Sequence, residues 1–383
     1  VKKEEDIMKK FNKFLSVAVA SAMVMSMAGC GNTDNGSAAT GTNAATESAA
    51  GDNGAAAGSV FKIGGIGPTT GGAAVYGLAV QHGAEIAVEE INAAGGINGY
   101  QVEFKFQDDE ADAEKSVNAY NALKDWGAQI IDGSTTSGAC IAVTDKTKED
   151  NMFQITPSGS AVECVQYDNN FRVCFSDPNQ GLASAQYIGE NGLAEKVAVI
   201  YDSSDVYSSG IYEKFAKEAE NQPFEVVAAE AFTADNKTDF SVQLQKAKDA
   251  GADMVFLPIY YQESALILTQ AAAMGYAPKW FSCDGMDGIL GGVDNFDVSL
   301  TEGVMLLTPF AADATDDLTK SFVSKYKEKY GETPNQFAAD SYDAIYVIKA
   351  AIEKSGVTPD MSVSDICDGM KAAMTEITVD GLT

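Results

Sequence analysis

The sequence has little of the chemistry on which most active sites depend. Its 383 residues include a single histidine, His82, and a single arginine, Arg172. The histidine falls in an expected helix without a nucleophile placed as a catalytic triad requires, and the six cysteines lack metal-ligand spacing. Basic residues are outnumbered 26 to 55 by acidic ones, for a net charge of −29. We therefore expect no enzyme, no metal and no cofactor, and nucleic acid is a poor partner.

The first 30 residues follow the order of a secretory signal peptide. Lys9, Lys10 and Lys13 precede an uncharged apolar run from Phe14 to Met27, which ends at Cys30 after Ala28-Gly29. A transmembrane helix is the alternative, but the run is shorter than the roughly 20 apolar residues that span a bilayer. Small residues before a cysteine resemble the bacterial lipobox. We expect a lipoprotein signal peptide at 8–29, with Met8 as initiator, and an extracytoplasmic protein held at the membrane by lipidated Cys30.

Residues 30–59 consist mainly of Ala, Gly, Ser, Thr and Asn and contain no aromatic side chain. Such a composition cannot bury apolar surface, so this stretch predicts a disordered tether. Residues 1–29 hold five lysines and three acidic residues, which leaves 21 basic and 52 acidic residues after them, a net charge of −31.

Two of the remaining cysteines flank a short segment. Cys164 and Cys174 enclose residues 165–173, and outside the cytoplasm they could close a small loop by a disulfide. Free buried thiols are the alternative, and the sequence leaves both open.

Strand and helix patterns alternate from Val60 onward. The expected strands are 61–63, 102–106, 130–131, 153–155, 197–201, 224–229, 254–257, 280–281 and 304–307. The expected helices are 78–94, 113–126 with Asp112 as N-cap, 139–149, 181–190, 211–219, 241–248, 264–273, 318–330, 337–353 and 363–374. Alternation of this kind predicts α/β architecture with parallel sheets covered by helices. The pattern restarts after about Ser176, which indicates two similar lobes.

Ligands of such sheets bind beyond the carboxyl ends of the strands. The loops expected there are 67–77, 133–138, 157–161, 202–208, 258–262 and 284–288. They are rich in Gly, Ser, Thr, Tyr and Asp and contain neither His nor Lys. This inventory favours hydrogen bonding to a small polar molecule over catalysis.

Several stretches together resemble the type I periplasmic binding proteins, in the leucine/isoleucine/valine-binding branch of ABC importers. They are Lys62–Pro68, Ile91–Gly99, Asp108-Asp109, Ile155–Ser158, Phe171–Val173 and Phe337–Ala344. The resemblance covers about 60–383 and implies two Rossmann-like lobes joined by a hinge. Lobe 1 would comprise 60–174 and 308–383, and lobe 2 would comprise 175–307. The family usually continues beyond the position of Thr383, so we expect a C-terminal truncation.

The resemblance also implies how an amino acid is held. The carboxylate needs donors at helix N-termini, and by similarity Thr136, Ser137, Ser158 and Ser160 supply them from lobe 1. Ordinary capping and turn formation is the alternative for such residues. By similarity Asp284 pairs with the ammonium group, where many family members have glutamate. Four aromatic residues would line the remaining walls: Tyr76, Tyr207, Tyr260 and Phe337.

The resulting hypothesis is an extracytoplasmic substrate-binding lipoprotein that captures a branched-chain or similar amino acid. Its lobes would close on the ligand, and the closed monomer would deliver the ligand to ABC permease subunits. The alternative is an amino-acid- or amide-sensing module that feeds a receptor. Gene neighbours that encode permeases and ATPases would favour transport, whereas a neighbouring kinase or chemoreceptor would favour sensing.

Overall fold

The structure is a computed structural model that describes residues 58–383. The expected signal peptide at 8–29, the lipidation site Cys30 and nearly all of the expected tether at 30–59 lie outside the described residues. Within residues 58–383, no helix combines the length and the apolar character that a membrane span needs.

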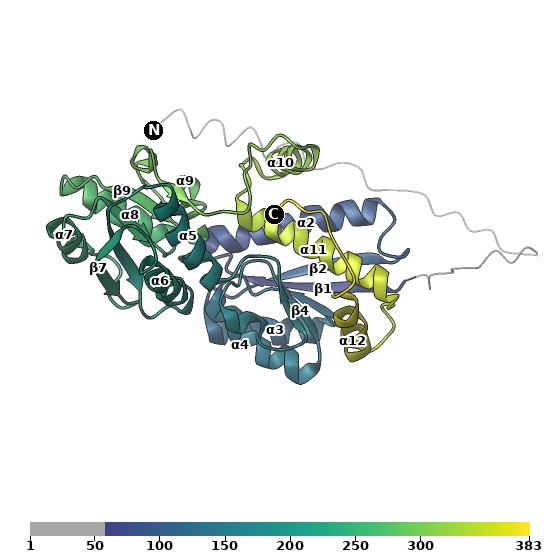
Figure 1. Ribbon diagram of the computed structural model, residues 1–383. Coiled ribbons are helices and arrows are strands. Elements are labelled where there is room, and N and C mark those ends of the chain that lie inside the picture. The colour runs from purple at the N-terminus through teal and green to yellow at the C-terminus, as the bar shows by residue number, and fades with distance from the viewer. Residues whose placement is uncertain (1–57) are drawn as a thin grey trace, which may run out of the picture. The chain divides into compact units, whose positions relative to one another are not determined.

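The first lobe is built on a five-stranded parallel sheet in the order β2-β1-β3-β4-β5. Its strands are β1 (Val60–Gly67), β2 (Gln101–Asp108), β3 (Ile130–Asp132), β4 (Phe153–Thr156) and β5 (Asn170–Arg172). Helices α2 (Ala74–Ala93) and α11 (Gln336–Ser355) cover one face of the sheet, and α3 (Ala113–Trp126) and α4 (Ser137–Asp150) cover the other (Figure 1). Helix α12 (Val363–Ala373) contacts α11 and β4.

The two faces of this sheet bury different side chains because successive residues of a strand point to opposite sides. Ile130 packs into the core beneath α2 and α11, whereas the next residue, Ile131, packs against α3 and α4. Both are fully buried. A strand of continuous apolar residues is what a sheet covered on both faces requires.

The second lobe repeats the plan with a parallel sheet in the order β10-β9-β8-β6-β7. Its strands are β6 (Lys196–Asp202), β7 (Glu225–Phe232), β8 (Met254–Leu257), β9 (Lys279–Ser282) and β10 (Met305–Leu306). Helices α5 (Asp177–Glu190) and α6 (Val206–Ala219) share a core on one face. On the other face lie α7 (Ser241–Asp249) and α8 (Tyr261–Ala273).

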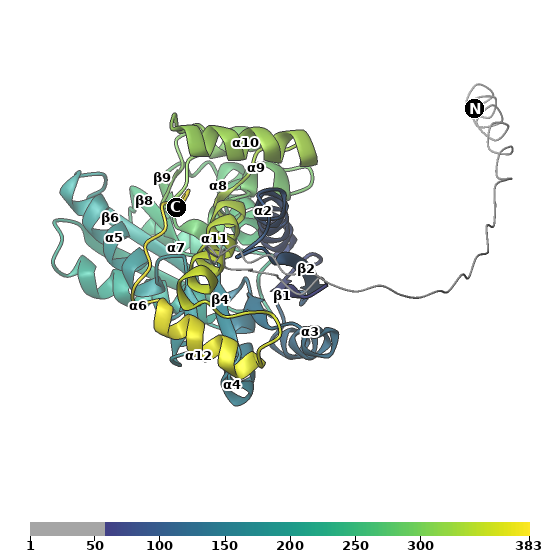
Figure 2. The ribbon, with the colours of Figure 1, turned by 90° about the vertical axis from the view of Figure 1, so that its right-hand side faces the viewer.

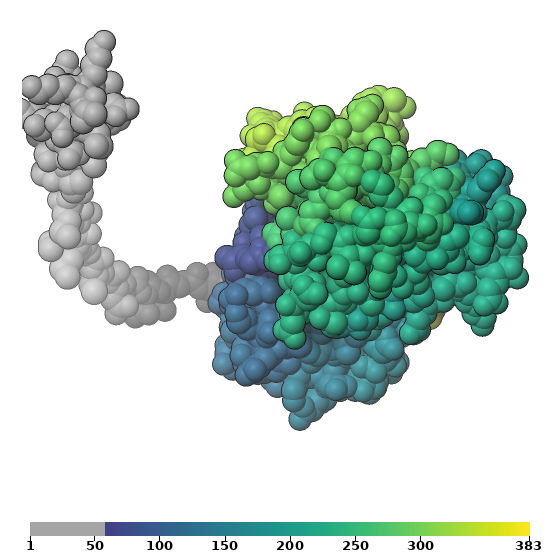
Figure 3. Space-filling view, turned by 90° about the vertical axis from the view of Figure 1, so that its left-hand side faces the viewer, coloured from purple at the N-terminus to yellow at the C-terminus, as the bar shows by residue number. Residues whose placement is uncertain are grey.

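Short helical segments occupy the loops beyond these strands. They are η1 (Val162–Val165), η2 (Asp284–Met286), α9 (Ile289–Gly292) and η3 (Val298–Thr301). Helix α10 (Asp317–Tyr330) contacts α2 after the chain has left the second sheet. In Figure 3 the second lobe, in teal and green, packs directly against the purple and blue residues of the first.

These sheets confirm the predicted fold class of two parallel-sheet α/β lobes. Every helix and strand expected from the sequence is present, although the boundaries move. The prediction that Asp112 caps a helix is also confirmed, because its carboxylate accepts the N–H groups of Glu114 and Lys115 at 2.9 Å each. Strand β5 was not predicted, since three residues at a sheet edge carry little periodic signal.

A close contact joins the first-lobe helices that come from distant parts of the sequence. Helices α2 and α11 lie side by side (Figures 1 and 2). They meet at Gly83, where an added Cβ would lie 2.0 Å from the backbone oxygen of Ala338. The absence of a side chain at Gly83 therefore allows helix α11 to pack closely against α2.

The substitution Gly83→Ala should destabilise the protein by about 1–3 kcal/mol, because the new methyl group must push two buried helices apart. Urea unfolding of the ligand-free protein measures the effect. Gly138→Ala is the matched control in another helix: a Cβ there meets nothing within 4 Å, so it should be neutral or stabilise by about 0.5–1 kcal/mol. Equal stability of the two variants would contradict the close contact.

Candidate functional site

A cavity lies between the two lobes, beyond the carboxyl ends of both sheets. It is lined by all nine residues that the sequence suggested as ligand contacts, together with Thr135 and Gly285: Tyr76, Thr136, Ser137, Ser158, Ser160, Tyr207, Tyr260, Asp284 and Phe337. The cavity volume is only about 20 Å³. That is room for about one water molecule, so a larger ligand requires the lobes to part.

The first lobe presents a hydrogen-bond donor to this cavity through Ser137. Its hydroxyl oxygen accepts the backbone N–H groups of Ser160 and Ala161, both at 3.1 Å. Because both lone pairs are used, the hydroxyl proton remains to be donated. Its nearest described acceptor is the Ser160 hydroxyl, at a long 3.5 Å. Ser137 is also the first residue of α4, where the helix dipole favours an anion.

Ser158 has the opposite polarity. Its hydroxyl donates to the backbone oxygen of Thr135 at 2.7 Å, so it presents lone pairs to a neighbouring group. The Thr136 hydroxyl is buried and has no hydrogen-bond partner within residues 58–383. The first lobe can therefore donate to an anion at Ser137 and accept from a cation at Ser158.

The second lobe contributes a buried carboxylate. Asp284 follows β9, is 3% exposed, and accepts the Tyr207 hydroxyl at 2.6 Å and the Gly285 N–H at 2.8 Å. Both bonds go to the same oxygen, Oδ1. Burial raises the pKa of Asp284 to about 6, against the lowering effect of its hydrogen bonds. The group is thus largely ionised at neutral pH, which suits it to pairing with an ammonium ion.

Aromatic rings form the remaining walls. Tyr76 of the first lobe lies against Phe337 with ring centroids 4.4 Å apart, and against Tyr260 of the second lobe at 5.4 Å. Tyr260 in turn contacts Tyr207 at 5.1 Å. This continuous surface suits an aliphatic side chain, since aromatic rings bury large apolar area with little loss of conformational entropy.

Two hydrogen-bonded contacts link the lobes beside the cavity. The Tyr76 hydroxyl donates to the Gly285 backbone oxygen and accepts the backbone N–H of Tyr261 at 3.2 Å. Nearby, the N–H of Gln336, at the start of α11, donates to Asp287 of the second lobe at 2.9 Å. These contacts hold the lobes in a closed arrangement.

Comparison with known proteins identifies the architecture. Residues 60–383 match the family described as periplasmic binding protein. This chain belongs to that family. The Leu/Ile/Val-binding protein homolog 3 of Brucella melitensis is 32% identical over 301 residues, covering 78% of this chain and 80% of the relative. The leucine-, isoleucine-, valine-, threonine- and alanine-binding protein of Pseudomonas aeruginosa is 30% identical, covering 77% and 79%.

Solved structures agree with this membership. The branched-chain amino acid transporter substrate-binding protein LivJ of Streptococcus pneumoniae, in complex with isoleucine, has a TM-score of 0.72 and 29% identity. The leucine-binding protein LivK of Thermotoga maritima has a TM-score of 0.71 and 29% identity. The match covers 81% of this chain and 87% of the solved chain in both cases. The chain is thus a type I periplasmic binding protein of the Leu/Ile/Val branch.

Two residues beside the cavity of this periplasmic binding protein were not predicted from the sequence. Asp177 and Gln180 lie one turn apart on α5, and both are buried. The Asp177 N–H donates to the Ser160 backbone oxygen at 3.0 Å, and Gln180 accepts the Asp284 N–H at 3.3 Å. The feature of the sequence that could have indicated them is a pair of polar residues spaced i, i+3, directly after the chain crosses from the first lobe to the second.

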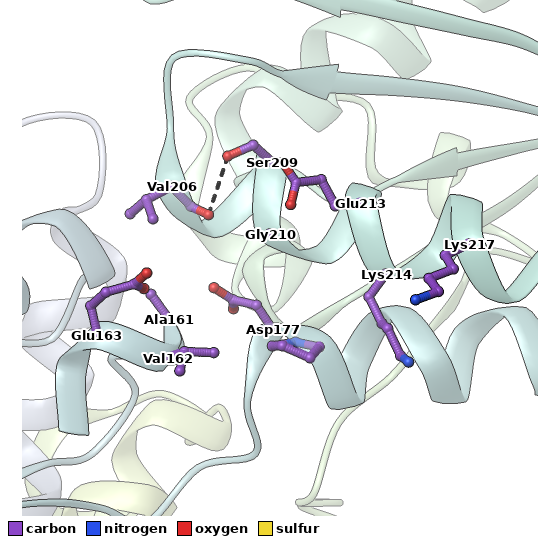
Figure 4. A pocket seen from close by; sticks show the side chains of 11 residues that line it. Ala161, Val162, Glu163, Asp177, Val206, Ser209, Gly210, Glu213, Lys214 and Lys217 are labelled. Atoms are coloured by element: carbon purple, nitrogen blue, oxygen red, sulfur yellow. Dashed lines mark hydrogen bonds between the residues drawn. The ribbon is translucent and has the colours of Figure 1, made fainter. Parts of the chain in front are cut away.

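Asp177 lines a second, larger cavity of about 500 Å³ at the junction of the lobes. Figure 4 shows it between Ala161–Glu163 on one side and Val206 and Ser209 of α6 on the other. Burial raises the pKa of Asp177 to about 8, with further contributions from the charges of Asp284 and Asp205.

The sequence left both a Cys164–Cys174 bridge and two free thiols open, and in this structure both residues are buried free thiols. Within residues 58–383, no group of three or more His, Cys, Asp or Glu side chains is arranged to hold a metal ion.

Several buried carboxyls should make stability fall as pH rises. Burial raises the pKa of Asp109, Asp205 and Asp284 to about 6, of Asp132 to about 7 and of Asp177 to about 8. The folded protein therefore retains protons that the unfolded chain releases near pH 4, and stability declines between about pH 4 and 8. Urea midpoints of the ligand-free protein at pH 5, 6.5 and 8 measure this.

The variant Asp132→Asn keeps an uncharged group at one of these positions and should show a smaller decline. Its side chain contacts Ser341 away from the cavity lining, so the comparison does not involve the ligand contacts. A wild-type stability that is constant or increases from pH 5 to 8 would contradict this account.

Proposed function

We propose that this protein is the extracytoplasmic substrate-binding lipoprotein of an ABC importer and that it captures a branched-chain or similar aliphatic amino acid. The observation that carries the proposal is the polarity of the cavity. One wall offers the Ser137 proton and a helix N-terminus to an anion, and the opposite wall offers the Asp284 carboxylate to a cation. An α-amino acid carries both charges on one carbon atom, so it can satisfy both lobes at once.

The side chain of such a ligand would face the aromatic surface of Tyr76, Tyr260 and Phe337. Relatives named for binding leucine, isoleucine and valine support an aliphatic side chain. Asp284 is one methylene shorter than glutamate, so the ammonium group must approach the second lobe more closely.

Capture proceeds by closure of the lobes. A ligand that contacts Ser137 on one lobe and Asp284 on the other binds the closed state better than the open one, and this difference drives the population toward closure. Tyr76 then re-forms its bonds to Gly285 and Tyr261 across the entrance. The closed protein, held at the membrane through Cys30, would deliver its ligand as a monomer to the permease subunits.

A ligand panel tests the substrate class. Isothermal titration with L-Leu, L-Ile, L-Val, L-Ala, L-Thr and L-Phe should give saturable binding for the aliphatic residues. Thermal unfolding should shift upward by several degrees at saturation, because a ligand at 100 times its Kd adds about 2.7 kcal/mol. Cooperative unfolding with no shift for any amino acid would reject the class.

Asp284→Asn should weaken binding of the best ligand by about 100-fold or more, because it removes the negative charge that faces the ammonium group in a buried site. Titration calorimetry measures the loss. The matched control is Asp249→Asn, an exposed aspartate in the same lobe whose side chain contacts only Gln245 in the described chain. Near-normal affinity of Asp284→Asn would remove this residue from the site.

The affinity of the wild-type protein should also fall as pH decreases through about 6, since protonation of Asp284 removes its charge. Asp284→Asn should lose most of this dependence between pH 5 and 7. A wild-type affinity that is independent of pH in that range would show that the ammonium group pairs elsewhere.

A further inference from the structure

Two cysteines that are far apart in the sequence meet behind the first-lobe wall of the ligand cavity. Cys140 lies in the first turns of α4, and Cys164 lies in η1. Their exposed fractions are 0% and 1%, and with Ala161 they form a small separate core cluster. Nothing in the sequence pairs them, because 23 residues lie between them.

The two side chains pack in one buried cluster with Ala161. Cys140 has the largest of the effects that raise the pKa of the Cys164 thiol, followed by burial, and Cys174 and Asp177 contribute through their charges. Cys164 also donates to the Ser137 backbone oxygen at 3.6 Å, and Cys140 accepts from Gln154 at 3.5 Å. The connecting loop passes close by, since a Cβ on Gly159 would lie 3.1 Å from the Cys140 sulfur.

Cys174 lies outside this cluster, which consists of Cys140, Ala161 and Cys164. The pKa of its own thiol is raised by burial and by the charges of nearby aspartates, without an effect from Cys140.

We propose that Cys140 and Cys164 are an oxidisable pair that forms an intramolecular disulfide when the protein meets an oxidised low-molecular-weight disulfide. The family is extracytoplasmic, and in such compartments disulfides form and persist. This inference does not depend on which ligand the protein binds.

The reaction is two successive thiol–disulfide exchanges. The thiolate of one cysteine attacks a sulfur of oxidised glutathione, forms a mixed disulfide and releases one glutathione thiol. The thiolate of the second cysteine then displaces the other glutathione. The protein loses two thiol hydrogens and two electrons, and one glutathione disulfide becomes two glutathione thiols. Because the Cys164 pKa is raised, exchange is slow in the folded protein and faster during refolding at pH 8.5.

The disulfide would brace the anion-binding wall of the site. The closed loop, residues 140–164, contains Ser158 and Ser160, and Ser137 lies immediately before it. It would tie η1 to the first turns of α4 and so fix the N–H groups of Ser160 and Ala161 against the Ser137 hydroxyl. Figure 4 shows Ala161 and the first two η1 residues, Val162 and Glu163, facing α6 across the junction cavity.

Peptide mapping tests the pairing directly. Reduced, unfolded protein is refolded at pH 8.5 with oxidised and reduced glutathione, blocked with an alkylating agent and digested with trypsin. Cleavage at Arg172 separates the Cys164 peptide from the Cys174 peptide, and cleavage at Lys146 releases the Cys140 peptide. The expected product joins residues 125–146 to 149–172. Its formation should raise the melting temperature by about 5 °C, and dithiothreitol should reverse this.

Single substitutions supply the controls. Cys174→Ser should retain the cross-linked peptide and the shift in melting temperature, whereas Cys140→Ser should lose both while remaining folded. The proposal is overturned if Cys140 and Cys164 are recovered alkylated after refolding with oxidised glutathione. It is equally overturned if the bridge forms between Cys164 and Cys174.

Discussion

A buried carboxylate between two lobes is the constraint around which this site is organised. Asp284 is almost inaccessible to solvent, and its carboxylate accepts its described hydrogen bonds from a phenol and a backbone N–H rather than from a cation. Burying an ionised group is costly unless a counter-charge accompanies it. In the proposed function, closure of the lobes favours a ligand that brings a positive charge, and the opposite wall suits a ligand that also carries a negative charge.

The opposite wall, formed by the first lobe, obtains its polarity from hydroxyl groups, because none of the first-lobe residues in the cavity lining is charged. The Ser137 hydroxyl oxygen accepts two backbone N–H groups, so its proton remains to be donated. The Ser158 hydroxyl donates its proton to a backbone oxygen, so its lone pairs remain to accept. Two serines thus act in opposite senses only because of the backbone around them. This arrangement rests on the loops that follow β3 and β4, which parallel pairing brings to one edge of the sheet.

The sequence predicted the fold well and the edges of the site poorly, for one physical reason. Helices near the cavity begin earlier than their apolar periodicity indicates: α5 starts at Asp177 rather than at 181, α6 at Val206 rather than at 211, and α8 at Tyr261 rather than at 264. Residues of these first turns line the cavities at the lobe junction or contact the other lobe, as Asp177, Tyr207 and Tyr261 do, so they do not follow a simple apolar helical pattern. Asp177 was missed in this way.

Other parts of the site depended on information that periodicity does not contain. The nine suggested contacts came from resemblance to a family, and the structure brings them together around one cavity. The hydrogen-bond polarity of Ser137 and Ser158 depends on tertiary contacts, and so does the meeting of Cys140 with Cys164. The sequence could not decide between a Cys164–Cys174 bridge and free thiols, because closeness along the chain says nothing of the direction in which side chains point, and the structure has free thiols.

In the proposed mode of binding, each lobe recognises one charge of a zwitterion. Titration of the wild-type protein with leucine, leucinamide and 4-methylpentanoate at pH 7 separates the two charges, because the two analogues lack the carboxylate and the ammonium group respectively. Each analogue should bind at least about 100-fold more weakly than leucine, since each leaves one buried wall unpaired. Binding of either analogue within a few-fold of leucine would show that the charge it lacks is not recognised.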